Sequence, residues 1–286
     1  MQEPRFLGDL ARPPAFRGET LPTARGDYFA ASGMCSACHS AMRDAAGNDV
    51  SIDTYWRATM MANAARDPYW QAAVRAEVMA NPAIADVIED TCARCHMPMA
   101  RTTSAFQGEV GKVLDEGYLN AENDLHVLAM DGVSCTLCHQ IEDQYLGSDE
   151  SFDGGYVIDS ATPMGERVTY GPYQASENDA RLMSGASGFV PVQGTHLQTS
   201  ALCATCHTLY TPTVDAQGNV VGHFPEQTPY QEWEASDYAD RQSCQDCHMP
   251  EVDGEVSLSI TNSPPRSPFS RHAFAGGNTY ALMLLR

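Results

Sequence analysis

The feature that most constrains this chain is a short signature, Cys-x-x-Cys-His, which occurs five times in 286 residues. In a helical turn the two cysteines lie on one face, and the histidine that follows presents its imidazole beside them. This arrangement suits covalent attachment of a c-type haem, in which the thiols react with the two vinyl groups and the imidazole binds the iron. We therefore predict five covalently bound haem c groups. The five signatures contain all ten cysteines: Cys35/Cys38-His39, Cys92/Cys95-His96, Cys135/Cys138-His139, Cys203/Cys206-His207 and Cys244/Cys247-His248.

Paired cysteines have two other common uses, and the sequence disfavours both. Cys-x-x-Cys pairs form half of many zinc sites, but five pairs do not combine evenly into four-cysteine sites. Zinc also gives no reason for a histidine to follow every second cysteine. A disulfide framework would not need the histidines at all. Haem attachment accounts for every cysteine and for the five signature histidines.

The second axial ligand of each iron decides the chemistry. Four of the nine histidines lie outside the signatures, and scarce histidines beside haems are good candidates for distal ligands. We predict that His126, His196 and His272 bind iron, and we retain His223 as a candidate on a predicted hairpin.

Four histidines cannot fill five distal positions. A methionine can fill the remaining one and raise that haem's potential, for which Met60 and Met61 are best placed. Lys112 is a weaker candidate. The third alternative is an open iron, where enzyme chemistry would enter.

The charge of the chain restricts its partners. The formal net charge is −20, from 37 acidic and 17 basic side chains. Nucleic acid and anionic membrane surfaces would repel such a protein. We expect redox proteins as electron donors and acceptors, with a homo-oligomer or filament as a possible assembly.

Haem c is attached outside the cytoplasmic membrane, so we expect a periplasmic or extracellular protein. The first residues lack a basic region followed by an apolar one, and we expect a signal that was removed or a fragmentary chain.

No window of the sequence approaches the roughly eighteen consecutive apolar residues of a membrane span. No spare cysteine is left to carry a lipid. The apolar run at residues 280–286 suggests that the natural protein continues.

The signatures begin at residues 35, 92, 135, 203 and 244, which is not the fixed period of a repeat protein. We predict an extended N-terminal arm at residues 1–34 and a single multihaem domain at residues 35–286. A region rich in Gly, Ser and Asp near residues 147–191 is predicted to be a loop insertion. The expected fold is mainly α, with much irregular loop and a small β-hairpin, wrapped around a chain of haems.

Local patterns predict several elements. A helix is expected over residues 53–66, and Asp67-Pro68 opens a second helix as N-cap and first-turn proline. The Asn81-Pro82 pair is expected to start another helix in the same way, before the second signature. A hairpin is expected at residues 211–223, and a capping box at residues 228–231 is expected to start the helix that leads to the fifth signature. Short β-like pieces are expected at residues 155–158 and 167–170.

Several segments resemble the multihaem c-type cytochromes related to hydroxylamine oxidoreductase and its electron-acceptor cytochrome. They are residues 170–173 (YGPY), 196–211 (including SALCATCHTLYT), 224–233 (FPEQTPYQEW), 243–250 (SCQDCHMP) and 272–278 (HAFAGGN). The resemblance implies a mainly helical fold, closely stacked haem pairs and electron transfer outside the cytoplasm. It also implies that His126, His196 and His272 are distal ligands, whereas His223 matches no position clearly.

Taken together, the sequence predicts an electron carrier rather than an enzyme, and we assign no catalytic residues. One alternative is a multihaem reductase or oxidase that acts on a small nitrogen or sulfur compound at one open haem. The other is a subunit of an extracellular cytochrome filament. Both alternatives keep all five haem attachments.

Overall fold

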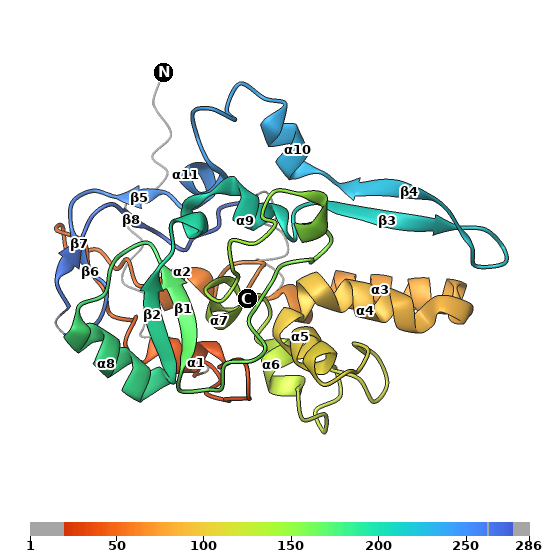
Figure 1. The fold of residues 1–286 in the computed structure, drawn as a ribbon, viewed down its shortest axis with the longest axis horizontal. Helices are drawn as coiled ribbons and strands as arrows, with labels where there is room; N and C mark the ends of the chain where they lie inside the picture. Colours follow the sequence, from red (N-terminus) through yellow and green to blue (C-terminus); the bar gives the residue numbers. More distant parts are fainter. Residues whose placement is uncertain (1–19, 262, 277–286) are drawn as a thin grey trace, which may run out of the picture.

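The computed structural model describes residues 20–261 and 263–276, which form short helices joined by long irregular segments (Figure 1). The α-helices are α1 (Ser32–Ser36), α2 (Ile52–Trp56), α3 (Pro68–Ala80), α4 (Ala85–His96), α5 (Pro98–Phe106), α6 (His126–Met130), α7 (Cys135–Cys138), α8 (Glu177–Ser187), α9 (Ser200–Ala204), α10 (Pro229–Glu234) and α11 (Cys244–His248). The 3₁₀ helices are η1 (Ala64–Arg66), η2 (Pro82–Ile84), η3 (Asp149–Ser151) and η4 (Thr195–Gln198). This confirms a chain of short helices with much irregular structure.

The strands of the described residues form four two-stranded sheets. They are β1 (Arg167–Gly171), β2 (Phe189–Gln193), β3 (Leu209–Val214), β4 (Val220–Gln227), β5 (Glu251–Val252), β6 (Val256–Ser257), β7 (Pro265–Arg266) and β8 (Phe269–Ser270). β1 and β2 are parallel, whereas β3 with β4, β5 with β8 and β6 with β7 are antiparallel. No helix of the described residues has the length and apolar character needed to cross a bilayer.

Helices α3, α4 and α5 carry and support the second signature. Asp67 caps α3 by accepting a hydrogen bond of 2.9 Å from the Tyr69 backbone N–H, and Pro68 occupies the first turn, as predicted. Trp70 and Val74, four residues apart, form the buried face of α3. The Asn81-Pro82 step starts the short helix η2, after which α4 runs to His96.

The helix predicted over residues 53–66 is largely wrong. Helix α2 ends at Trp56, and turns lead to η1. Thr59 donates its hydroxyl to the Trp56 carbonyl at 2.7 Å and accepts from the Ala62 N–H, while the Asn63 amide donates to the Arg57 carbonyl at 3.1 Å. These side chains compete with the helical backbone bonds and stop the helix.

The region predicted as a loop insertion contains regular structure. Strand β1 is confirmed near its predicted position, but residues 155–158 form no strand. Helix α8 was not predicted, although Ser176 caps it through a 3.1 Å bond from the Asp179 N–H and Gly188 ends it at φ 81°. The parallel pairing of β1 with β2 depends on α8 as the connection between them.

The β3–β4 hairpin is confirmed, and in Figure 1 it projects from the body of the molecule. Its turn begins at Asp215, whose carboxylate accepts bonds from the backbone N–H groups of Gln217 and Asn219, both at 2.9 Å. The same turn, with sequence DAAGN in place of DAQGN, occurs at residues 44–48. In both turns, an aspartate and a glycine therefore direct the chain reversal in the same way.

The capping box predicted at residues 228–231 is wrong. The Thr228 side chain makes no capping bond, and α10 ends at Glu234, well before the fifth signature. A capping box forms instead at Ser243 and Asp246, directly at the start of α11. The fifth signature is thus positioned by its own cap.

The core is divided into three clusters, two of which include residues of a signature. One cluster packs Trp70 and Val74 of α3 against Ala93, Met97 and Ala100. A second joins residues far apart in sequence: Phe29, Ala31, Met99, Leu128, Leu137, Ile141 and Ile158. A third contains Met42, Val50, Val252, Val256 and Phe269. Residues 1–19 of the predicted arm lie outside the described residues, and Phe29 to Gly33 are buried in the body.

Candidate haem-binding sites

Each signature forms one helical turn, as the haem prediction requires. The histidine N–H bonds to the first cysteine's carbonyl at 3.0 Å in His39, 3.1 Å in His139 and 3.0 Å in His207. His96 and His248 lie at the ends of α4 and α11. The ten cysteines are free of disulfides. Within residues 20–261 and 263–276, no group of three or more His, Cys, Asp or Glu side chains is placed to hold a metal ion.

Four signature histidines are held by backbone carbonyls. Nδ1 lies 2.6 Å from the Leu258 oxygen in His39, 3.3 Å from the Ala64 oxygen in His96, 2.6 Å from the Tyr170 oxygen in His139 and 2.5 Å from the Ala275 oxygen in His248. Because a carbonyl only accepts, Nδ1 is the protonated nitrogen and Nε2 keeps its lone pair. This is the arrangement of a histidine that binds a metal through Nε2.

The signature histidines also favour the neutral form. Burial lowers the pKa of His39, His96 and His139, because a low-dielectric surrounding disfavours the charged imidazolium. A neutral imidazole is the form that ligates metals. The donor chemistry of these residues therefore fits haem iron.

His272 lies beside the third signature. Its ring centroid is 6.4 Å from that of His139, and the two planes differ by 19°. Two imidazoles that bind one metal ion from opposite sides, with bonds of about 2 Å, have centroids roughly 6 Å apart. Nδ1 of His272 is buried without a hydrogen-bond partner, and burial together with the nearby His139 lowers the pKa of His272 to about 3. A neutral, unsatisfied imidazole at this place fits a second axial ligand.

The other two predicted distal histidines differ from each other. His126 begins α6, and its Nδ1 lies 2.8 Å from the Tyr118 carbonyl, so Nε2 is the free nitrogen. His196 instead bonds through Nε2 to the Ile141 carbonyl at 2.8 Å. A Cβ at Gly194 would come within 2.6 Å of the His196 ring, so only glycine leaves room for this placement. In this position His196 offers Nδ1 rather than Nε2.

The remaining candidate ligands lie in varied surroundings. His223 is exposed on β4, opposite Pro212. Met60 and Met61 are half-buried in the turns after α2, and the Met61 carbonyl accepts from the Val133 N–H at 2.9 Å, just before the third signature. Lys112 is exposed and lines a cavity of about 350 Å³. The surroundings of these four residues neither support nor contradict a role in binding iron.

Three pairs of thiols from different signatures lie close enough to shift each other's pKa. The interaction of Cys35 with Cys135 lowers the pKa of Cys35 and raises that of Cys135. The interaction of Cys206 with Cys95 lowers the pKa of Cys206 and raises that of Cys95. The interaction of Cys244 with Cys203 lowers the pKa of Cys244 to about 6 and raises that of Cys203. The structure thus joins the first signature to the third, the second to the fourth and the fourth to the fifth.

The other four cysteines are outside these three pairs, although the sequence predicts the same attachment role for all ten. Burial raises the pKa of Cys92 to about 11 and that of Cys138 to about 12. Cys38 is half-buried, and Cys247 is the one exposed cysteine of the chain. The structure therefore places Cys38 and Cys247 apart from the thiol contacts between signatures. Their predicted attachment to haem depends on the motif that they share with Cys35 and Cys244, and it stays a prediction.

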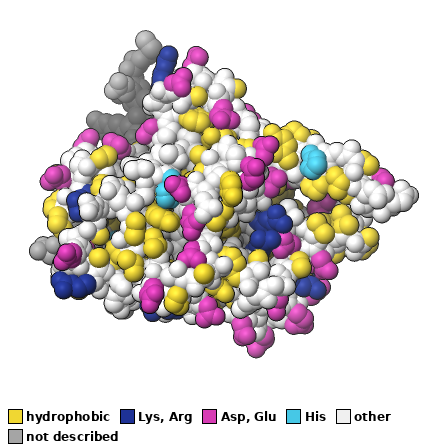
Figure 2. Space-filling view, in the orientation of Figure 1, with side chains coloured by type: hydrophobic (Ala, Val, Ile, Leu, Met, Phe, Trp, Pro, Cys, Tyr) yellow, Lys and Arg dark blue, Asp and Glu magenta, His cyan; other side chains and the backbone are white. Residues whose placement is uncertain are grey.

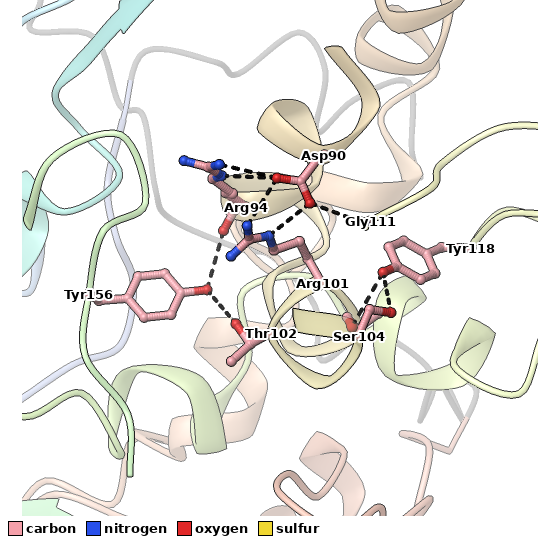
Figure 3. Close-up of polar contacts among 9 residues, drawn as sticks. Asp90, Arg94, Arg101, Thr102, Ser104, Gly111, Tyr118 and Tyr156 are labelled. Carbon is pink, nitrogen blue, oxygen red and sulfur yellow. Dashed lines mark hydrogen bonds and ion pairs between the residues drawn. The ribbon is translucent and has the colours of Figure 1, made fainter. Parts of the chain in front are cut away.

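The second signature is supported by a charged network (Figure 3). Asp90 accepts bonds from Arg94 at 3.1 Å, from Arg101 at 3.0 Å and from the Gly111 N–H at 2.9 Å. Burial alone would raise the pKa of Asp90, but the bonds from Arg101 and Gly111 outweigh it, and the net shift is downward. The preceding Glu89 accepts the N–H groups of Val113 and Leu114, both at 2.7 Å. Trp70 stacks on the His96 ring at 4.4 Å.

The first and third signatures are tied together by polar groups that the sequence did not single out. Asp131 is 1% exposed and accepts from the Ser32 N–H at 2.8 Å and the Ser32 hydroxyl at 2.7 Å. Burial raises the pKa of Asp131. Thr136 donates to the Ala30 carbonyl at 2.7 Å. The contacts span about a hundred residues, so no local sequence signal could have revealed them.

No protein-family model and no curated protein matches the sequence. Among solved structures, the chain is similar to a penta-haem cytochrome c552 from Thermochromatium tepidum, with a TM-score of 0.48 and 18% sequence identity. The likeness covers 86% of this chain and 57% of that one. The chain therefore spans less than two thirds of the length of that cytochrome.

Proposed function

We propose that this chain is an exported multihaem c-type cytochrome that transfers electrons through five covalently bound haems. The observation that carries the proposal is the recurrence of one local geometry: five Cys-x-x-Cys-His turns, in four of which a backbone carbonyl fixes the histidine Nδ1. Haem iron would supply the redox chemistry. The chain attaches, orients and insulates the haems. The acidic side chains spread over the face in Figure 2 suit partners with basic docking surfaces.

The contacts between signature segments suggest the order in which the sites communicate. The first signature lies against the third, because Asp131 accepts a hydrogen bond from Ser32, and the fifth lies against the fourth, because the Cys244 N–H donates to the Ser200 hydroxyl. The second and fourth signatures share one neighbouring segment, in which the Gly154 N–H donates to the Thr205 carbonyl and the Tyr156 hydroxyl donates to the Arg94 carbonyl. Nε2 of His196, just before the fourth signature, lies 2.8 Å from the carbonyl of Ile141, just after the third, so the third and fourth signatures are also neighbours. The proposed path runs from the first through the third to the fourth, with branches to the second and fifth.

The proposal is tested on the holoprotein, produced in a host that attaches haem c. We expect a pyridine haemochrome assay and intact mass to give five haems per chain, and electron paramagnetic resonance to show bis-histidine iron at the third signature. His272→Ala should retain five haems and make one high-spin. Phe224→Ala, which removes an exposed ring from β4 that cannot bind iron, is the control and should leave the spectrum unchanged. Fewer than five haems in the unmodified protein would contradict the proposal.

A second function is favoured by the number of histidines, because the four outside the signatures cannot supply a second ligand to each of five irons. A haem that lacks a second protein ligand would bind and reduce or oxidise a small nitrogen or sulfur compound. Adding cyanide or nitrite to the oxidised holoprotein distinguishes the two functions. A carrier with closed irons gives no spectral change, whereas an open iron gives a high-spin signal that shifts.

A further inference from the structure

Arg167 is a buried cation that has no carboxylate partner among residues 20–261 and 263–276. It is 2% exposed, and its guanidinium donates to the Gln140 side-chain oxygen at 2.9 Å, the Thr162 carbonyl at 2.7 Å and the Asp159 carbonyl at 2.5 Å. The guanidinium carbon lies 5.4 Å from the centre of the Tyr28 ring. The ion pairs of the described residues involve Arg57, Arg94 and Arg101. All three hydrogen-bond partners of Arg167 are neutral, so its full positive charge remains.

The acidic groups nearest to Arg167 do not neutralise it. Glu142 and Asp159 line the same cavity, of about 60 Å³, but neither carboxylate lies within 4.0 Å of the guanidinium. Burial lowers the pKa of Arg167, and Asp159 offsets part of this. An arginine stays protonated in proteins, so the site holds a buried charge, which is costly without a counter-ion.

Arg167 is coupled directly to the third signature. Its partner Gln140 follows His139 in the chain and is fixed by a further bond of 2.6 Å to the Thr136 carbonyl. The strand that carries Arg167 also holds His139, because the His139 Nδ1 lies 2.6 Å from the Tyr170 carbonyl and the Tyr170 N–H bonds back to the His139 carbonyl at 2.6 Å. The charge therefore lies one hydrogen bond away from the residue next to a proximal iron ligand.

We propose that Arg167 raises the reduction potential of the haem attached at Cys135 and Cys138. Ferric iron carries one more positive charge than ferrous iron, so a fixed cation in a low-dielectric region disfavours the oxidised form. Because the chain has a net charge of −20, most of its surroundings act in the opposite direction. Arg167 is thus a tuning residue that favours residence of an electron at the third site. The inference rests on the proposed function, since it requires a haem there.

The test is a spectroelectrochemical titration of the five-haem protein and three variants. Arg167→Gln removes the charge and retains amide donors, and we expect one of the five midpoint potentials to shift downward while the others stay unchanged. Arg167→Lys retains the charge, and its midpoint should remain near that of the unmodified protein. Arg181→Gln makes the same change in net charge at an exposed position of α8 and should shift none.

An unchanged set of potentials in Arg167→Gln would overturn the inference, and so would equal shifts in the Gln and Lys variants, which would indicate a structural effect. If Arg167→Gln does not fold, Glu142→Gln removes a half-buried carboxylate from the same cavity and should shift the same midpoint upward. The absence of that shift would also overturn the inference. Haem content and spin state are measured on every sample. Fewer than five haems in the unmodified protein contradicts the proposed function instead.

Discussion

The second and third signatures share one sequence motif but lie in opposite charge environments. At the second, the buried charge is Asp90, and Arg94 and Arg101 compensate it. Beside the third, Arg167 is buried and has only neutral partners among the described residues. The same sequence motif therefore lies beside a compensated carboxylate in one place and an uncompensated cation in the other. The properties of each site depend on what the fold brings to the signature.

The two environments also differ in how they are built. Asp90 and Arg94 are four residues apart on α4, and α5 follows directly with Arg101. Arg167 reaches Gln140 from a strand 27 residues further along the chain. The second site is thus assembled mainly from one local helical segment. The third site needs long-range packing of β1 against the turn after α7.

The largest expected effect tests the support of the second signature. Trp70 is 7% exposed and stacks on His96, so Trp70→Ala should lower the free energy of unfolding by about 4 kcal/mol. The spectrum of one haem should change as well. Urea unfolding of the holoprotein measures the first effect and absorbance the second. Trp233→Ala, which removes a less buried indole away from this site, is the control, and an equal loss in both variants would refute a special role for Trp70.

A second experiment compares the charges directly. Asp90→Asn leaves two arginines uncompensated and should cost about 3 kcal/mol at neutral pH. The pKa of Asp90 is below its ordinary value of 3.8, so its contribution to stability is complete above 3.8 and is lost as the pH falls through the lower folded value. The difference in unfolding free energy between wild type and Asp90→Asn should therefore shrink on acidification.

Asp131, beside the first and third signatures, should behave in the opposite way. Burial raises its pKa above 3.8, so the folded state favours the protonated form and gains stability as the pH falls through that raised value. Relative to Asp131→Asn, the wild type should become more stable on acidification. Urea unfolding over a series of pH values gives both slopes, and slopes of the same sign would show that the two environments do not differ as described.

The smallest expected effect concerns two tyrosines. Tyr118 donates its hydroxyl to Ser104 at 2.7 Å in the support of the second signature (Figure 3), and Tyr118→Phe should cost about 1 kcal/mol. Tyr170, at the third signature, contacts His196 through its ring, at 4.8 Å between centroids. Tyr170→Phe preserves this contact and should change stability by less. A larger loss from Tyr170→Phe would reverse the comparison.

Local chemistry explains which elements the sequence predicts well. The N-cap and proline of α3 and the turn of the β3–β4 hairpin at residues 215–219 are set by neighbouring residues, and both elements form as predicted. Two predictions fail. Thr59 and Asn63 end the helix expected over residues 53–66. The Thr228 side chain makes no capping bond, whereas Ser243 forms a capping box at the start of α11. Helix α8 was missed although Ser176 and Gly188 mark its ends.

The sequence by itself determined where haem attachment is predicted, because two thiols and an imidazole within five residues need only one helical turn to come together. The same short range explains the prediction of His39, His96, His139, His207 and His248 as proximal ligands. Only the tertiary structure decided which signatures lie together, that His272 lies beside His139, and that Arg167 is buried without a counter-ion among the described residues. Those features arise from packing between segments distant in sequence. Burial there determines how strongly each charged group interacts, and no local sequence pattern reveals the partner of each group.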